Sequence, residues 1–246
     1  LHDLARKTNN SFKFVFAGLH NVCRAAKDPN SVFGQLGEPL CIKPLSTADA
    51  YELLAKPLRY LGFAVNTDDL MHILVNTNFY PGIVHSVGYA LVENLSTRYR
   101  DFYNTDDNPP YSLTDKQLSG VLSGADLNAK IASKILLTLR ADPTNSYLML
   151  ARCIAYLYHE SPESNGEGYS VSEIKEYADL LEIKCLSSRT KSECLLLLDE
   201  LVDMGILVKP SSESYRLRQH RFLDVIGPTV ERIEADIEND QETADD

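Results

Sequence analysis

The residues best suited to chemistry by type and spacing are Asp199 and Glu200, which follow four consecutive leucines at 195–198. An acidic pair at the end of an apolar strand could hold magnesium and orient a water molecule for phosphate hydrolysis. That chemistry also requires a Gly-x-x-x-x-Gly-Lys-Ser/Thr loop upstream, and the sequence contains none. The neighbouring residues are good helix formers, and the run ends at Gly205, which favours a helix. We therefore expect both acids to lie on a solvated helix face without a catalytic role.

Other catalytic and metal-binding patterns are also absent from the sequence. Neither a Gly-x-Ser-x-Gly motif nor a His-Glu-x-x-His motif occurs. His72 and His85 are thirteen residues apart on different predicted helices, which does not indicate a metal site. The five cysteines are widely spaced with no Cys-x-x-Cys pair, as expected of reduced thiols in a cytoplasmic protein: Cys23, Cys41, Cys153, Cys185 and Cys194. We expect no catalytic or metal site in this chain alone.

An apolar segment near the N-terminus indicates a piece of a larger sheet. Phe12–Leu19 is apolar with little alternation, as in a strand covered on both faces, and it leads into the polar pair His20 and Asn21. Such a strand needs neighbours that the rest of the sequence barely supplies, and no phosphate-binding loop precedes it. We therefore expect a fragment, the back part of a nucleotide-binding protein. Residues 1–8 are expected to form a short amphipathic helix.

The middle of the sequence predicts a small bundle of helices. Ser46–Asp49 and Asn66–Asp69 both have the spacing of a helix start, in which a polar side chain accepts from a free backbone N–H. Pro57 is expected to kink the first helix, and Pro81 stands where a third helix would begin. Two further helices are predicted after the polar loop Asn104–Pro110: Thr114–Ser123 and Asp126–Leu139.

The pattern changes again from Ser146 onwards. A first apolar-periodic helix is followed by a second that begins at Tyr169–Glu173, and a third is predicted over Thr190–Met204. Two short strand patterns come next, Ile206–Val208 and Tyr215–Arg218, separated by a polar turn. Three helices and a hairpin in this order predict a winged helix-turn-helix.

The charge distribution bears on whether this winged helix binds DNA. The formal net charge is −11, but residues 231–246 hold eight acids and one arginine, so the rest carries only −4. The candidate phosphate-contacting cations are Arg189, Lys191, Lys209, Arg216 and Arg218. Four acids of the third helix oppose them: Glu193, Asp199, Glu200 and Asp203. The alternative, which we favour, is a winged helix that packs on its neighbours as a rigid connector.

The order of these pieces resembles the C-terminal portion of an AAA+-related ATPase of the STAND or origin-recognition type. The resemblance covers roughly residues 1–238. It rests on three segments in the family's order: Phe14–Asn21, Thr77–Gly82, and Leu195–Leu207 followed by Tyr215–Arg218. It implies the last strand of an ATPase core, then a helical lid, then a winged helix.

The resemblance also implies a nucleotide-sensing role for several residues. In that family a polar residue at the strand tip lies near the terminal phosphate, and His20 or Asn21 occupies the matching position. Tyr80–Pro81 lies where the family has a Gly-x-Pro element that packs on the adenine, although Gly82 here follows the proline. The family usually has a nucleotide-sensing arginine on this lid helix. No arginine stands near the start of the helix here, and His85 is the nearest polar candidate. Each assignment has an alternative. His20 and Asn21 can be read as polar loop residues after a strand, and Tyr80–Pro81 as a core tyrosine followed by a proline that simply starts a helix.

We therefore predict a mainly α, α+β chain in four parts. These are a remnant of a P-loop ATPase core at 1–44, a helical lid at 45–140, a winged helix at 141–238 and a disordered acidic tail at 239–246. No apolar run reaches the ~20 residues of a membrane span, so we expect a cytoplasmic protein without a membrane partner.

The resemblance implies a nucleotide-dependent molecular switch. The full-length parent is expected to be an ATPase that binds ATP or ADP with magnesium, whereas no cofactor is expected in this fragment alone. Its implied partners are the missing N-terminal P-loop domain, further copies of the chain in a homo-oligomer, and an effector or DNA. Two other classes stay open: a winged-helix DNA-binding regulator with a helical dimerisation half, and a non-catalytic protein-interaction module.

Overall fold

The computed structural model describes residues 45–98, 111–112 and 114–245, and six residues before them. The chain divides into two compact units, Leu1–Ile42 and Lys43–Asp246. Arg6 and Lys7 are helical, but the rest of the predicted helix at 1–8 lies outside the described residues. So do the predicted strand with His20 and Asn21, and the loop Asn104–Pro110. None of the helices in the described part is both long and apolar enough to cross a membrane.

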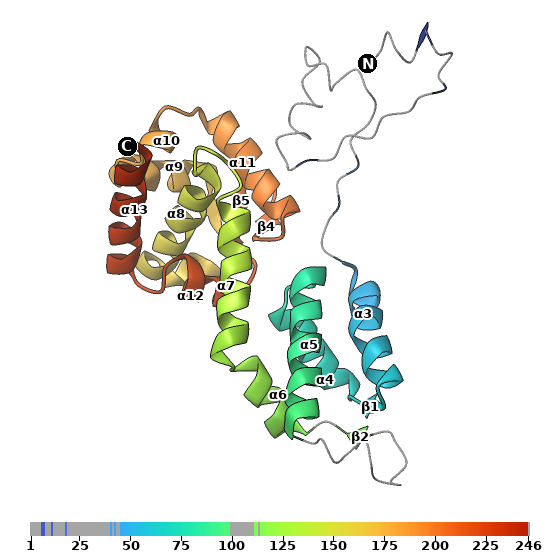
Figure 1. Cartoon of the computed structure of the whole chain (residues 1–246). Coiled ribbons are helices and arrows are strands. Elements are labelled where there is room, and N and C mark those ends of the chain that lie inside the picture. The colour runs from blue at the N-terminus through green and yellow to red at the C-terminus, as the bar shows by residue number, and fades with distance from the viewer. Residues whose placement is uncertain are drawn as a thin grey trace. The chain divides into compact units, whose positions relative to one another are not determined.

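Within the described residues, the first half of the second unit contains five helices (Figure 1). They are α3 (Thr47–Tyr60), α4 (Thr67–Asn76), α5 (Pro81–Arg98), α6 (Asp115–Leu122) and α7 (Ala125–Leu139). Ser46 and Asn66 cap α3 and α4 by accepting from the backbone N–H groups of Asp49 and Asp69, as predicted. Pro57 lies inside α3. A parallel pair joins β1 (Phe63–Ala64) to β2 (Tyr111–Ser112). We call this half the helical segment.

The second half surrounds a small antiparallel sheet (Figure 1). Its elements are α8 (Ser146–Glu160), η3 (Pro162–Asn165), β3 (Tyr169–Ser170), α9 (Val171–Leu180), α10 (Lys184–Ser187), α11 (Lys191–Asp203), β4 (Leu207–Ser211), β5 (Ser214–Leu217), η4 (His220–Phe222), α12 (Leu223–Ile226) and α13 (Val230–Asp245). The strand order is β3-β5-β4, so the last strand lies in the middle. The predicted helices and hairpin are present, whereas β3 was not predicted because two residues carry no strand pattern. We call this half the sheet segment.

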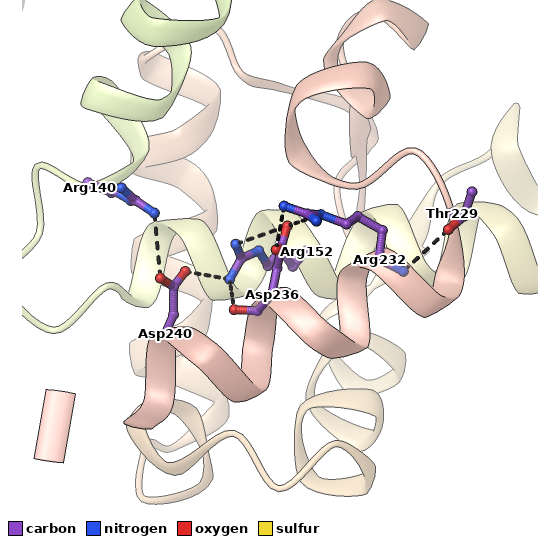
Figure 2. Close-up of polar contacts among 6 residues, drawn as sticks. All are labelled: Arg140, Arg152, Thr229, Arg232, Asp236 and Asp240. Atoms are coloured by element: carbon purple, nitrogen blue, oxygen red, sulfur yellow. Dashed lines mark hydrogen bonds and ion pairs between the residues drawn. The ribbon is translucent and has the colours of Figure 1, made fainter. Parts of the chain in front are cut away.

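The acidic tail does not follow the sequence prediction. Helix α13 continues to Asp245 through the residues predicted to be disordered from 239 onwards. Asp240 accepts a 2.6 Å hydrogen bond from Arg152 of α8, and Gln241 accepts one from the backbone N–H of Lys184 at 3.0 Å. Figure 2 shows the Arg152 guanidinium between Asp236 and Asp240. The acidic composition predicted a solvated tail, but Asp240 in this tail pairs with both Arg140 and Arg152.

Candidate functional site

The turn between α4 and α5 has an unusual backbone. Asn78 and Phe79 both have positive φ, at 53° and 57°, and bulky residues seldom adopt this left-handed conformation. The turn is held by the Phe79 N–H, which donates to Leu74 O at 3.2 Å, and by the Tyr80 N–H, which donates to Thr77 O at 3.1 Å. Pro81 then begins α5, as predicted.

This turn meets the turn between α11 and β4, which is 127 residues away in the sequence. The side-chain amide of Asn78, only 1% exposed, donates to the Gly205 carbonyl at 2.7 Å. Gly205 has φ of 71° and ends α11, as predicted, and the next carbonyl, of Ile206, accepts from the Arg218 N–H at 3.0 Å. Asn78, Tyr80, Gly205, Arg218 and the following Gln219 form what we call the corner junction.

Two polar atoms of the corner junction have no hydrogen-bond partner among the described residues. They are Asn78 Oδ1 and the Tyr80 hydroxyl, and both atoms are buried. Burial raises the pKa of Tyr80 to about 12, and the positive charge of Arg218 opposes this increase. Two predicted site residues from different segments, Tyr80 and Arg218, are therefore neighbours. A buried polar atom without a partner costs free energy, so these two atoms destabilise the closed junction.

A second contact between the two segments lies beside an unfilled space. Arg221 of η4 donates to the Asn128 side chain on α7, and Gln219 donates to the Val75 carbonyl at the end of α4. Next to Arg221 is a pocket of about 340 Å³, lined by residues of α4, α7, η4 and α12. Its polar lining comes from Asn76, Asn128, Arg221 and Asp224. The segments therefore meet around a pocket.

The predicted nucleotide-sensing residues of α5 lie near a lysine that sequence reasoning missed. Pro81 and His85 are exposed on α5, whereas Tyr80 is half-buried and packs against the core. Lys134 of α7 donates to the Gly82 carbonyl at 2.6 Å and to Ser86 Oγ at 3.2 Å. An imidazole and an ammonium group thus flank the first turn of α5. No sequence signal links Lys134 to this turn, because the two are 52 residues apart.

Several of the predicted nucleic-acid residues bond to other groups of the protein. Arg189 donates to Thr144 Oγ1 and Ser146 Oγ, both at 3.1 Å, and Lys191 donates to Ser172 Oγ at 3.0 Å. Lys209 pairs with Asp199 at 2.9 Å and lies over the Tyr215 ring. Arg216 is half-buried, and its Nε atom has no partner among the described residues. Arg218 lies at the corner junction, so most of these cations contact the protein itself.

The acidic pair of α11, predicted to lie on a solvated helix face, is half-buried and bonded to neighbouring elements. Asp199 is half-buried and accepts from the Tyr215 hydroxyl at 2.7 Å as well as from Lys209. Glu200 is half-buried and accepts from the Tyr147 hydroxyl of α8 at 2.6 Å. Both acids therefore fasten α11 to its neighbours, because the two tyrosines that reach them come from other elements.

Helix α11 begins with a capping box whose stability should depend on pH. The Glu193 carboxylate accepts from the Thr190 N–H at 2.7 Å, and Thr190 Oγ1 accepts from the Glu193 N–H at 3.3 Å. Hydrogen bonds from the Thr190 backbone, and then its side chain, hold the pKa of Glu193 below its usual 4.5. A carboxyl group with a lowered folded-state pKa stabilises the fold above its unfolded-state pKa, and this contribution is lost as the pH falls through the folded value.

We therefore expect Glu193→Gln to be less stable than the wild type near neutral pH and to differ less from it in acid. The glutamine keeps the capping geometry but cannot ionise. Urea unfolding of both proteins at about pH 7 and about pH 3 measures this difference. Glu176→Gln, at an exposed position on α9, is the control and should show no such trend. An equal stability gap at both pH values would contradict the expectation.

No protein-family model, curated protein or solved structure matches the chain. A functional assignment therefore rests on the geometry of the described residues.

Proposed function

We propose that the chain is the lid and winged-helix part of a nucleotide-dependent molecular switch. The observation that carries the proposal is the order of its elements: a helical segment whose long helix begins at an exposed proline, followed by a segment in which α8, α9 and α11 precede a hairpin. The sheet order β3-β5-β4 supports a winged helix, because the strand after the first helix pairs with the last strand of the hairpin.

The exposed start of α5 is the proposed nucleotide-facing surface. Pro81 has no N–H, and the Ile83 and Val84 N–H groups donate to the Tyr80 carbonyl, so the helix dipole is what gives this end its partial positive charge and favours an anion. Lys134 adds a full charge beside the same turn, and His85 adds an imidazole one turn further on. These groups would contact a nucleotide held by a preceding P-loop domain. ATP or ADP would then set the position of the lid.

The sheet segment is proposed to contact protein. Most of its candidate DNA-binding cations are engaged within the protein, and the turn of the hairpin carries Glu213 with no cation beside it at 211–214. Leu195 and Leu196 are 37% and 48% exposed on α11, the helix that would enter the major groove. Apolar and acidic side chains at that position suit another protein surface better than phosphate. An effector or a second copy of the chain is the proposed partner.

Nucleotide binding is the direct test of this proposal. Titration of a fluorescent ATP analogue into the protein that carries the coding sequence upstream of Leu1 should show binding. Lys134→Ala should weaken that binding about tenfold, because it removes a charge-assisted contact. Lys130→Ala, which removes an exposed lysine one turn earlier on α7, is the matched control and should not. Absence of nucleotide binding by this longer protein would overturn the proposal.

Fluorescence anisotropy with duplex DNA tests the rival class. At about 50 mM and about 200 mM salt, the chain is expected to bind DNA weakly at both concentrations. Tight binding that falls steeply with salt would favour a winged-helix DNA-binding regulator.

A further inference from the structure

The two segments of the unit are joined by few polar contacts. Asn78 donates to Gly205, Gln219 donates to Val75, and Arg221 donates to Asn128. The backbone passes from one segment to the other through the loop after α7, residues 140–145, which holds Asn145 in a left-handed conformation. These contacts lie far from that loop in the sequence. The buried apolar side chains of both segments belong to one continuous core, in which α7 packs against α8 and α12. Loss of the polar contacts would therefore release the α4–α5 turn from the hairpin while α7 stays packed.

The corner junction is costly to keep closed. Closing it buries Asn78 Oδ1 and the Tyr80 hydroxyl without hydrogen-bond partners among the described residues. It also contains two consecutive residues with positive φ, of which Phe79 is the more strained. Water could satisfy both polar atoms in an opened junction, so opening recovers part of their desolvation cost. A structure that only had to stay closed would gain by replacing the tyrosine with phenylalanine.

The pocket beside Arg221 is a second feature of the boundary between the segments. It is partly open to solvent, so the residues around it do not pack across the boundary there. The pocket of about 340 Å³ lies between α4 and α7 on one side and η4 and α12 on the other. The contact area between the segments is therefore reduced at the place where tight packing would hold them together.

We propose that the corner junction is a reversible latch. In the closed form the Asn78 amide holds the Gly205 carbonyl, and in the open form the α4–α5 turn separates from the turn before β4 while α7 stays packed against α8 and α12. The latch is a property of this chain and stands without the nucleotide assignment. If that assignment holds, movement of α5 by nucleotide would open or close the latch, because Tyr80 directly precedes α5.

Hydrogen–deuterium exchange of the whole chain without nucleotide tests the latch through two variants with opposite expected effects. Tyr80→Phe removes an unpaired buried hydroxyl, so peptides covering 74–84 and 204–220 should exchange about tenfold more slowly. Asn78→Asp keeps the shape and tolerates positive φ but lacks the amide donor, so the same peptides should exchange about tenfold faster. Peptides from the centre of α8, at 148–154, should be unchanged.

Each variant has a matched control on the same kind of residue. Tyr89→Phe removes a hydroxyl from a 59% exposed tyrosine of α5, and Asn145→Asp changes the left-handed asparagine before α8, which makes no side-chain capping bond. Neither should alter exchange at the corner junction. Faster exchange in Tyr80→Phe, or a change that extends equally to the centre of α8, would overturn the latch. Failure of nucleotide binding leaves the result untouched, since the assay contains no nucleotide.

Discussion

Replacing Arg152 with methionine is expected to lower the free energy of unfolding by about 3–5 kcal/mol. Arg152 is 4% exposed, and its Nη1 atom donates to Asp240 Oδ2 at 2.6 Å and to the Asp236 carbonyl at 2.9 Å. Its other terminal nitrogen lies 3.7 Å from an Asp236 carboxylate oxygen (Figure 2). The variant would remove the buried cation between two largely buried carboxylates, whose other arginine partners, Arg232 and Arg140, are largely exposed. Breaking a buried ion pair on one side is strongly destabilising.

Urea unfolding of three proteins measures this effect. Arg232→Met removes another arginine that pairs with Asp236, at 3.0 Å, but its side chain is 65% exposed, so we expect a loss below about 1 kcal/mol. The triple variant Arg152→Met, Asp236→Leu, Asp240→Leu removes both acids with the cation and should lie close to the wild type in stability. If Arg152→Met lowers the free energy of unfolding no more than Arg232→Met does, the ion pairs of Arg152 with Asp236 and Asp240 do not secure α13 to α8.

Gly168→Ala is expected to cost about 2–4 kcal/mol, because it strains the backbone and crowds a neighbouring strand. Gly168 has φ of +79°, and an added Cβ would lie 2.9 Å from the carbonyl oxygen of Tyr215. That oxygen belongs to the backbone of the central strand β5, where Tyr215 pairs with Tyr169. The strand cannot yield without disturbing the hydrogen bond from Ser214 Oγ to the Glu167 carbonyl, at 2.7 Å.

Thermal unfolding followed by circular dichroism measures the loss for Gly168→Ala. Gly166→Ala is a matched control two residues away, where an added Cβ meets no heavy atom within 4 Å. We expect the control to unfold within a few degrees of the wild type and Gly168→Ala to unfold about 8 °C or more below it. Equal midpoints for the two alanine variants would show that β3 does not need the left-handed glycine.

Local signals in the sequence were sufficient to predict the starts of several helices. Ser46, Asn66 and Thr190 cap helices at the positions expected, and Pro81 begins one. Gly205 follows the end of α11 in the conformation that glycine adopts most easily. These predictions succeed because a cap forms its hydrogen bonds within about four residues of itself, so both partners can be read from one short stretch.

Sequence reasoning could not tell which groups each cation would contact. Arg189 and Lys209 have the residue type of a phosphate contact, but each is bound to other groups of the protein, Arg189 to Ser146 and Lys209 to Asp199. Lys134 carried no signal of its own, yet it lies beside the start of α5. Residue type gives the charge of a side chain, whereas availability depends on neighbours that come from distant segments.

The sequence by itself determined where α3, α4, α5 and α11 begin, because those starts depend on neighbouring residues. Only the tertiary structure decided the two features on which the proposals depend. Arg152 and Asp240 are 88 residues apart, and Asn78 and Gly205 are 127 apart. An acidic run is predicted to be disordered when its charges have no partner, and α13 is ordered because folding brings a buried arginine to it. The same packing closes the corner junction, and at that junction it leaves two polar atoms unpaired.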